Sequence, residues 1–235
     1  MSQSKTIVAS ELDVSQVTYS DVKSLDNGAK IAYVNYGGGI GSIYLQTPSV
    51  VFPFDNQYYP DNDNSGKFAC KISLNTENPE IKLFVDKLLE MDNKVKEDAK
   101  KYCQSWFKKK TISNEVIDDK YTPIIRPYKD PESGEYTGKY PAQMAFKITR
   151  KNGNYQCKFF DDKRNKLNVD DDNSENYVNP ADILSKGNSA FILLQCTGLW
   201  FSQVGFGVSW KAVQMLVSIP EKLEDFAFRD MDNSK

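Results

Sequence analysis

The sequence has no histidine among its 235 residues. Ser-His-Asp triads, Cys-His dyads, His-ligated metal sites and His general bases are therefore excluded. The four cysteines are widely spaced and form no CxxC pair, so no zinc site is predicted. They are Cys70, Cys103, Cys157 and Cys196, each among apolar or aromatic neighbours, which is typical of reduced, buried thiols.

Long apolar runs are also lacking. No segment approaches the roughly 18 apolar residues that cross a bilayer, and the first residues, MSQSKTIVASELD, lack the apolar core of a secretory signal. We therefore expect a soluble, intracellular protein with no membrane partner. Hydrophobic residues make up 40% of the chain and charged residues 26%, which allows a single domain with a sizeable core.

Charge of one sign does not dominate, because the formal net charge is only −2. Basic residues nevertheless concentrate in 94–110 and 139–166, and association follows the local field rather than the total. Carboxylates cluster in 161–162 and 170–172, and two or three of them around Mg²⁺ would suffice for a nuclease. Such loops are normally solvated, so we expect no enzyme, no metal and no cofactor.

The spacing of apolar residues indicates the fold class. Between 79 and 109 they recur every three or four residues, which predicts one long amphipathic helix, and Asn78 followed by Pro79 suits its start. Short alternating segments elsewhere, such as 30–36 and 67–74, predict strands. The fold expected is α+β, a β-rich barrel or curved antiparallel sheet with one long inserted helix.

One segment, 198–214 (GLWFSQVGFGVSWKAVQ), mixes aromatic residues with glycines. Glycine lets a flat ring approach a strand, so this segment could form an open platform on which bases stack. The alternative is a buried strand pair with aromatic core residues.

Several short motifs, in their order along the chain, resemble those of a known family. They are IYLQTPSVVFPF (43–54), KISL (71–74), SWF (105–107), YTPIIR (121–126), GKYPAQMAFKI (138–148) and LWFSQVGFGVSWKAVQ (199–214). The family is that of the single-stranded DNA-binding proteins of nucleocytoplasmic large DNA viruses, including giant algal and amoebal viruses. The resemblance implies an OB-like barrel that binds single-stranded DNA without strong sequence preference. It also implies a role in viral DNA replication, recombination or repair, in the host cytoplasm or nucleus.

The residues and the resemblance together predict a nucleic-acid-binding surface. Neighbours on a regular strand point to opposite faces, so we expect at least one of Trp200 and Phe201 to be core, and Trp210 and Lys211 to divide likewise. The predicted set is Trp200, Phe201, Trp210, Lys211, Arg126, Lys147 and Arg150.

We expect one OB-like domain over residues 1–220 and a flexible, weakly acidic tail over 221–235. The related phage proteins end in a dense acidic tail, whereas Lys222, Arg229 and Lys235 dilute the acidic charge here. Replication proteins are expected as partners of the tail, and a homo-oligomer is left open. The alternative function is a viral structural or virion-interaction protein with no nucleic-acid role, which explains aromatic strands as sheet packing.

Overall fold

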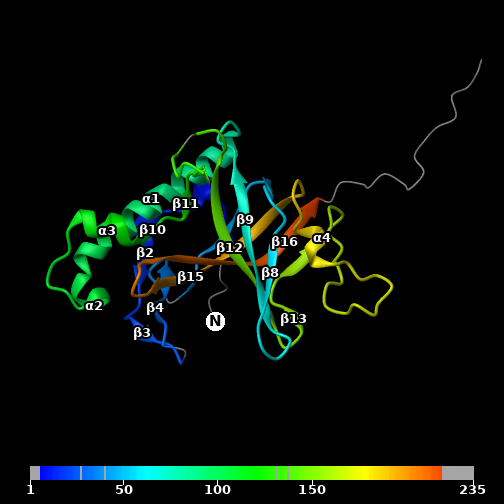
Figure 1. Cartoon of the computed structure of the whole chain (residues 1–235), viewed down its shortest axis with the longest axis horizontal. Coiled ribbons are helices and arrows are strands. Elements are labelled where there is room, and N and C mark those ends of the chain that lie inside the picture. The colour runs from blue at the N-terminus through cyan, green and yellow to red at the C-terminus, as the bar shows by residue number, and fades with distance from the viewer. Residues whose placement is uncertain (1–5, 27, 40, 131, 137, 219–235) are drawn as a thin grey trace, which may run out of the picture.

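The computed structural model describes residues 6–26, 28–39, 41–130, 132–136 and 138–218. Its strands form one 14-stranded sheet and a separate two-stranded sheet made of β2 and β5 (Figure 1). The strands are β1 (Thr6–Ile7), β2 (Val17–Tyr19), β3 (Lys23–Ser24), β4 (Lys30–Ala32), β5 (Val34–Tyr36), β6 (Tyr44–Gln46), β7 (Val50–Val51), β8 (Gln57–Pro60), β9 (Gly66–Leu74), β10 (Tyr121–Thr122), β11 (Ile125–Arg126), β12 (Ala142–Lys151), β13 (Asn154–Tyr155), β14 (Lys158–Phe160), β15 (Ser189–Phe201) and β16 (Phe206–Ser218). The helices are α1 (Pro79–Lys101), α2 (Cys103–Phe107), α3 (Asn114–Lys120) and α4 (Pro180–Ile183), and two 3₁₀ turns are η1 (Ala9–Glu11) and η2 (Val14–Gln16).

The large sheet closes on itself. Strand β15 pairs with β7, β7 with β9, β9 with β12, β12 with β16, and β16 again with β15. This ring encloses side chains such as Ile72, Met144 and Leu194, none of which has measurable exposure. A small barrel is filled by its own inward side chains, so only its outer surface is left for a ligand. The predicted β-rich α+β fold with a curved, closing sheet is confirmed.

The sheet is mixed, whereas an antiparallel sheet was predicted. Strands β10, β12 and β14 all run parallel to β16 and pair with it in succession. Strand β1 is also parallel to β6. The two-residue period of a strand shows which residues share a face but not which way a neighbour runs. The pairing of three separate segments with one long strand was therefore outside what the pattern could predict.

The long helix is shorter than predicted. Helix α1 ends at Lys101, Tyr102 departs from helical dihedral angles, and the chain resumes as α2. Lys108, with φ of 58°, then ends α2 in the left-handed region. One non-helical residue leaves the three-and-four spacing almost unchanged, so the period could not reveal the break. The apolar residues at this spacing that pack toward the barrel are buried, among them Phe84, Leu88, Met91, Val95 and Trp106.

A buried carboxylate joins α1 to the barrel. Asp92 is only 4% exposed and accepts hydrogen bonds from the Tyr121 hydroxyl at 2.5 Å and from the backbone N–H of Ile124 at 2.9 Å. Its second oxygen accepts from the N–H of Ile125 at 3.3 Å. Burial raises the pKa of Asp92, and these three hydrogen bonds oppose that rise. The carboxylate therefore fixes β10 and the start of β11, which lie beside α1 in Figure 1.

No helix of the described chain is both long enough and apolar enough to cross a membrane. The buried residues of the barrel, α1 and the N-terminal strands form one continuous hydrophobic core. The boundary predicted at residue 220 and the tail over 221–235 lie outside the described residues, so both stay predictions.

Replacing Leu88 with alanine is expected to destabilise the protein by about 2–5 kcal/mol, because it leaves a cavity under α1. Leu88 has no measurable exposure, whereas its neighbour Leu89 is 42% exposed. Leu89→Ala is therefore the matched control and should change the free energy of unfolding by less than about 0.5 kcal/mol. Denaturant unfolding measures both, and equal losses would contradict the docking of this face.

Replacing Asp92 with asparagine is expected to cost about 1–3 kcal/mol for each backbone N–H left without an acceptor. An amide nitrogen would face a donor of Ile124 or Ile125 in place of an oxygen. Lys82 and Asp86 form an exposed pair at 2.6 Å on the same helix, so Asp86→Asn is the control and should be nearly neutral. Thermal unfolding of Asp92→Asn at the wild-type temperature would refute this anchoring role.

Candidate nucleic-acid interface

Alternation along β9 produces a row of lysines on the outside of the barrel. Phe68, Cys70 and Ile72 are buried, and they alternate with the exposed Lys67 and Lys71. Successive side chains of a strand point to opposite faces, so both lysines lie outside.

The neighbouring strands extend this row. On β12, Lys147 is exposed between the buried Phe146 and Ile148, and it pairs with Lys211 of β16. On β11, Arg126 pairs with Gln143, which also points outward. We call this surface the basic sheet face, and its charged residues are Lys67, Lys71, Arg126, Lys147 and Lys211.

These cations have no carboxylate partner. The salt bridges in the described part of the chain involve lysines of α1, and none involves a residue of the basic sheet face. The surrounding strands remove water from the Lys147 ammonium, although its side chain is exposed, and this lowers its pKa; repulsion from Lys67 lowers the pKa further. Uncompensated positive charge of this kind attracts an anion.

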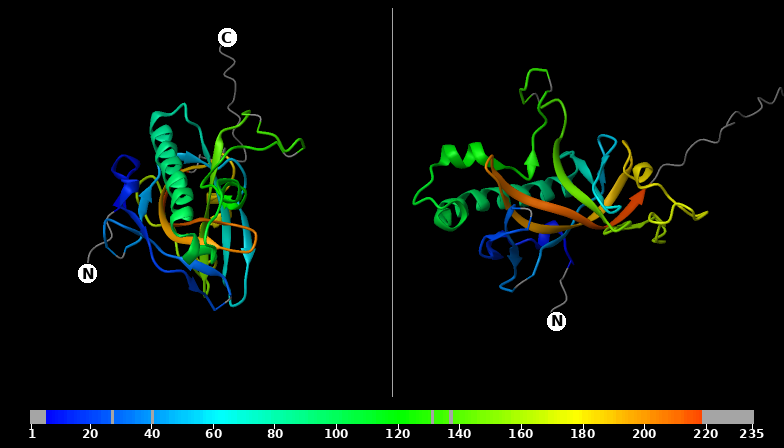
Figure 2. Two further views of the ribbon diagram at one scale, coloured as in Figure 1. Left: turned by 90° about the vertical axis from the view of Figure 1, so that its left-hand side faces the viewer. Right: turned by 60° about the horizontal axis from the view of Figure 1, so that its bottom comes forward.

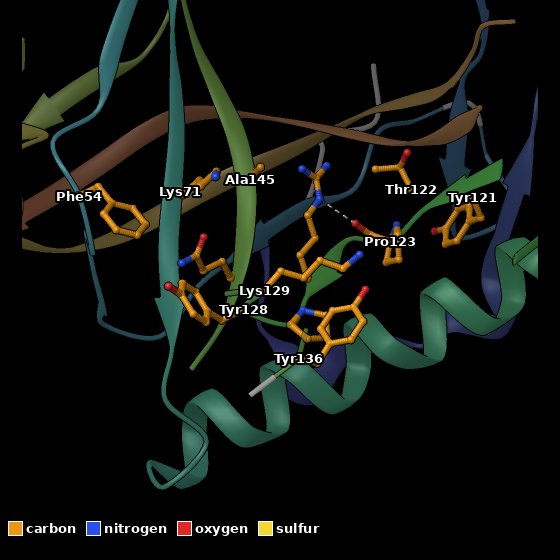
Figure 3. A pocket seen from close by; sticks show the side chains of 12 residues that line it. Phe54, Lys71, Tyr121, Thr122, Pro123, Tyr128, Lys129, Tyr136 and Ala145 are labelled. Carbon is orange, nitrogen blue, oxygen red and sulfur yellow. Dashed lines mark hydrogen bonds between the residues drawn. The ribbon is translucent and has the colours of Figure 1, made fainter. Parts of the chain in front are cut away.

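A hollow of about 490 Å³ lies at one end of the basic sheet face. In Figure 3, Phe54 and Lys71 stand at one end of it and Thr122 and Pro123 at the other. Arg126 also lines the hollow and donates from its Nε to the backbone carbonyl of Pro123 at 3.2 Å, which orients its guanidinium. The lining contains no carboxylate: Phe54, Lys71, Tyr121, Thr122, Pro123, Arg126, Pro127, Tyr128, Lys129, Tyr136, Gln143 and Ala145.

Exposed aromatic rings border this hollow. Tyr136 is 64% exposed and Phe54 48%. The ammonium of Lys129 lies 4.8 Å from the centroid of the Tyr136 ring, and Tyr128 packs edge-on against Tyr140 at 4.7 Å. A base stacked on such a ring gains about 1–3 kcal/mol.

Trp200 lies on the same side of the sheet as Lys211. It pairs with Gly207, whose neighbour on the other side is Thr122 at the edge of the hollow. A side chain at Gly207 would come within 3.2 Å of the Trp200 ring and 2.8 Å of the Thr122 carbonyl. Glycine at this position therefore lets the half-buried Trp200 ring pack closely against β16, next to Thr122.

Three of the predicted site residues have to be corrected. Phe201 and Trp210 are 8% and 2% exposed and belong to the core, because they alternate with the outward Trp200 and Lys211. Arg150 lies an odd number of residues from Lys147, so it points to the opposite side of β12. There it donates to the Gly153 carbonyl at 3.0 Å and covers the Tyr155 ring.

The structure brings together Arg126, Lys147, Lys211 and Trp200, which were predicted, with residues that were not. Lys67 and Lys71 carry a sequence signal, since KFACKISL places both on one face of a strand. The residues Tyr128, Lys129 and Tyr136 lie between strands, where no period marks them.

Comparisons with known proteins show weak structural similarities to solved structures and a match to one family model. No curated protein matches the sequence. A single-stranded DNA-binding protein of bacteriophage T7, gp2.5, is 14% identical with a TM-score of 0.43, over 83% of this chain and 98% of that chain. The single-stranded DNA-binding protein of bacteriophage Enc34, in complex with single-stranded DNA, is 9% identical with a TM-score of 0.42, over 87% of this chain and 97% of that chain.

A family model matches residues 71–230, which include the basic sheet face except Lys67. Its description assigns no activity, so the function has to be argued from the surface described above. The chain belongs to the family of unknown function DUF5871.

Proposed function

We propose that the basic sheet face binds single-stranded DNA without strong sequence preference. The observation that carries this proposal is the convergence of unpaired cations and exposed aromatic rings around one hollow without carboxylates. Cations track the phosphates and rings stack on the bases, which is how sequence-tolerant single-strand binders work.

The character of the surface favours a single strand over a duplex. Tyr136 and Phe54 offer ring surface in the lining of the hollow, and Trp200 lies next to Thr122 at its edge. A base reaches a ring face only when it is unpaired. Apart from its cations and its tyrosine hydroxyls, the lining has two polar side chains that can form directed hydrogen bonds to base edges, Gln143 and Thr122. Discrimination between bases needs such directed contacts, so we expect little sequence preference.

The proposed contact residues are revised accordingly. Arg126, Lys147, Lys211 and Trp200 are kept from the sequence prediction, and Phe201, Trp210 and Arg150 are left out. The added residues are Phe54, Lys67, Lys71, Tyr128, Lys129 and Tyr136.

We place this activity in viral DNA replication, recombination or repair, and as binding rather than catalysis. The support for a viral setting is the resemblance of the sequence motifs to the proteins of large DNA viruses. Replication proteins as partners of the tail rest on the same resemblance. The alternative is a viral structural protein, which would leave the basic sheet face without a nucleic-acid ligand.

The proposal predicts salt-sensitive binding that depends on Lys147 and Lys211. Fluorescence anisotropy with oligo-dT should show binding that weakens with salt. The logarithm of the binding constant should fall with the logarithm of the salt concentration, with a slope of about −0.7 for each neutralised phosphate. The double variant Lys147→Glu/Lys211→Glu should bind at least about tenfold more weakly and lose about 1.4 from that slope, since two phosphate contacts are removed.

Lys163→Glu/Lys166→Glu is the matched control, because it changes the charge equally at exposed lysines of the loop after β14, outside the basic sheet face. Duplex DNA and RNA oligomers should be titrated alongside. Absence of any anisotropy change with oligo-dT at micromolar protein and low salt would refute DNA binding. Equal losses of affinity for oligo-dT in the two double variants would refute the assignment of the basic sheet face as the binding surface.

A further inference from the structure

A second basic hollow lies at the far end of the β15–β16 hairpin. It measures about 460 Å³, and the side chain of Phe201 lines it. Trp200, the preceding residue, points to the opposite side of the sheet, toward the first hollow. The two hollows therefore lie on the two sides of the same hairpin end, against which α2 and α3 pack. The second hollow is lined by Gly28, Lys30, Trp106, Phe107, Lys109, Ile112, Val116, Lys120, Phe201, Ser202 and Gln203.

The charge of this hollow is positive. Three lysines line it, Lys30, Lys109 and Lys120, and no carboxylate does. None of the three forms a salt bridge within the described ranges. Of the nearby acidic residues on α3, Asp118 is paired with Lys96 at 2.8 Å, on the side of α3 that faces α1. An anion would therefore meet uncompensated cations here.

The wall of the hollow is aromatic but offers little ring surface. Trp106 and Phe201 are only 6% and 8% exposed. Their centroids lie 5.6 Å apart, and Phe107 packs edge-on against Phe201 at 5.9 Å. Because Trp106 and Phe201 are so fully covered by their neighbours, a base cannot stack on them without disturbing the core. A sugar–phosphate backbone needs no ring face and fits an apolar wall topped by lysines.

The two hollows are close along the chain. Lys120 lines the second and Thr122 lines the first, so two residues of extended chain, about 7 Å, separate them. Strand β10 between them pairs only with β16 in the described structure, so its other edge has no strand partner. In a duplex, successive phosphates of one strand are spaced about 3.4 Å along the helix axis, and in an extended single strand they are spaced farther apart. One or two nucleotides therefore bridge this distance.

We propose that the second hollow is a phosphate-binding subsite, which takes the backbone of the same DNA strand after it crosses the edge of β10. This inference rests on the proposed function. The first hollow holds bases against exposed rings, and the second holds backbone only. The total length of strand covered is accordingly greater than the basic sheet face alone can hold.

The test is the length dependence of binding in Lys109→Glu/Lys120→Glu. Oligo-dT from about 6 to about 30 nucleotides covers the range of site sizes known for such barrels. Wild type and variant should bind the shortest oligomer equally. For the long oligomers the variant should bind about tenfold more weakly, and its salt slope should be smaller by about 1.4. Lys163→Glu/Lys166→Glu is again the control for overall charge.

Other results overturn the inference in distinguishable ways. Equal affinity of wild type and variant at every length refutes the subsite and leaves the proposed function intact. An equal loss at every length, the shortest included, shows a general field effect and also refutes a separate subsite. No binding by the wild type at any length refutes the proposed function itself. If the glutamate variant does not fold, Lys109→Gln/Lys120→Gln replaces it in the same titrations.

Discussion

Closure of the strand ring is the constraint on which the rest of the structure depends. The strands β15, β7, β9, β12 and β16 pair in a circle. Side chains along each strand of such a barrel therefore point alternately to the inside and to the outside. The inside is filled by apolar residues. The outside is free to carry charge. Lys147 and Lys211 are register partners on neighbouring strands, so their positive charges lie side by side. A register slip of one residue would bury these lysines and expose their apolar neighbours.

The second determinant is the contact between α1 and the segment that follows α3. Asp92 holds Tyr121, Ile124 and Ile125 through three hydrogen-bonding groups in a buried setting. This short segment carries Thr122 and Arg126 into the first hollow, and Lys120 just before it reaches the second. A buried carboxylate without these donors would be strongly destabilising, so the segment and the helix stabilise each other. The helix is thus structural, yet it positions part of the proposed binding surface.

The sequence predicted correctly those features that follow from the periodic spacing of apolar residues in a helix or a strand. The three-and-four spacing identified the buried face of α1, and alternation predicted that Trp210 and Lys211 point to opposite faces, as they do. The prediction failed for residues whose place in the fold depends on long-range geometry that leaves no periodic pattern in the sequence. Arg150 was assigned by its charge, although its distance from Lys147 on one strand puts it on the other side. Tyr136 and Lys129 lie in a connecting segment and come to the hollow only because β11 and β12 pair. The parallel pairing of β10, β12 and β14 with β16 likewise depends on long-range contacts.

Photo-crosslinking to single-stranded DNA that carries a photoreactive pyrimidine tests the central claim most directly, because it maps the ligand onto named residues. The account predicts that crosslinked peptides contain the rings in and beside the first hollow, namely the exposed Tyr136 and the half-buried Tyr128 and Trp200. Figure 2 shows the β15–β16 hairpin, which carries Trp200, from two further sides. Salt should reduce these crosslinks together with binding. Crosslinks confined to surfaces away from the basic sheet face, such as the exposed Phe191 and Leu83, would contradict it.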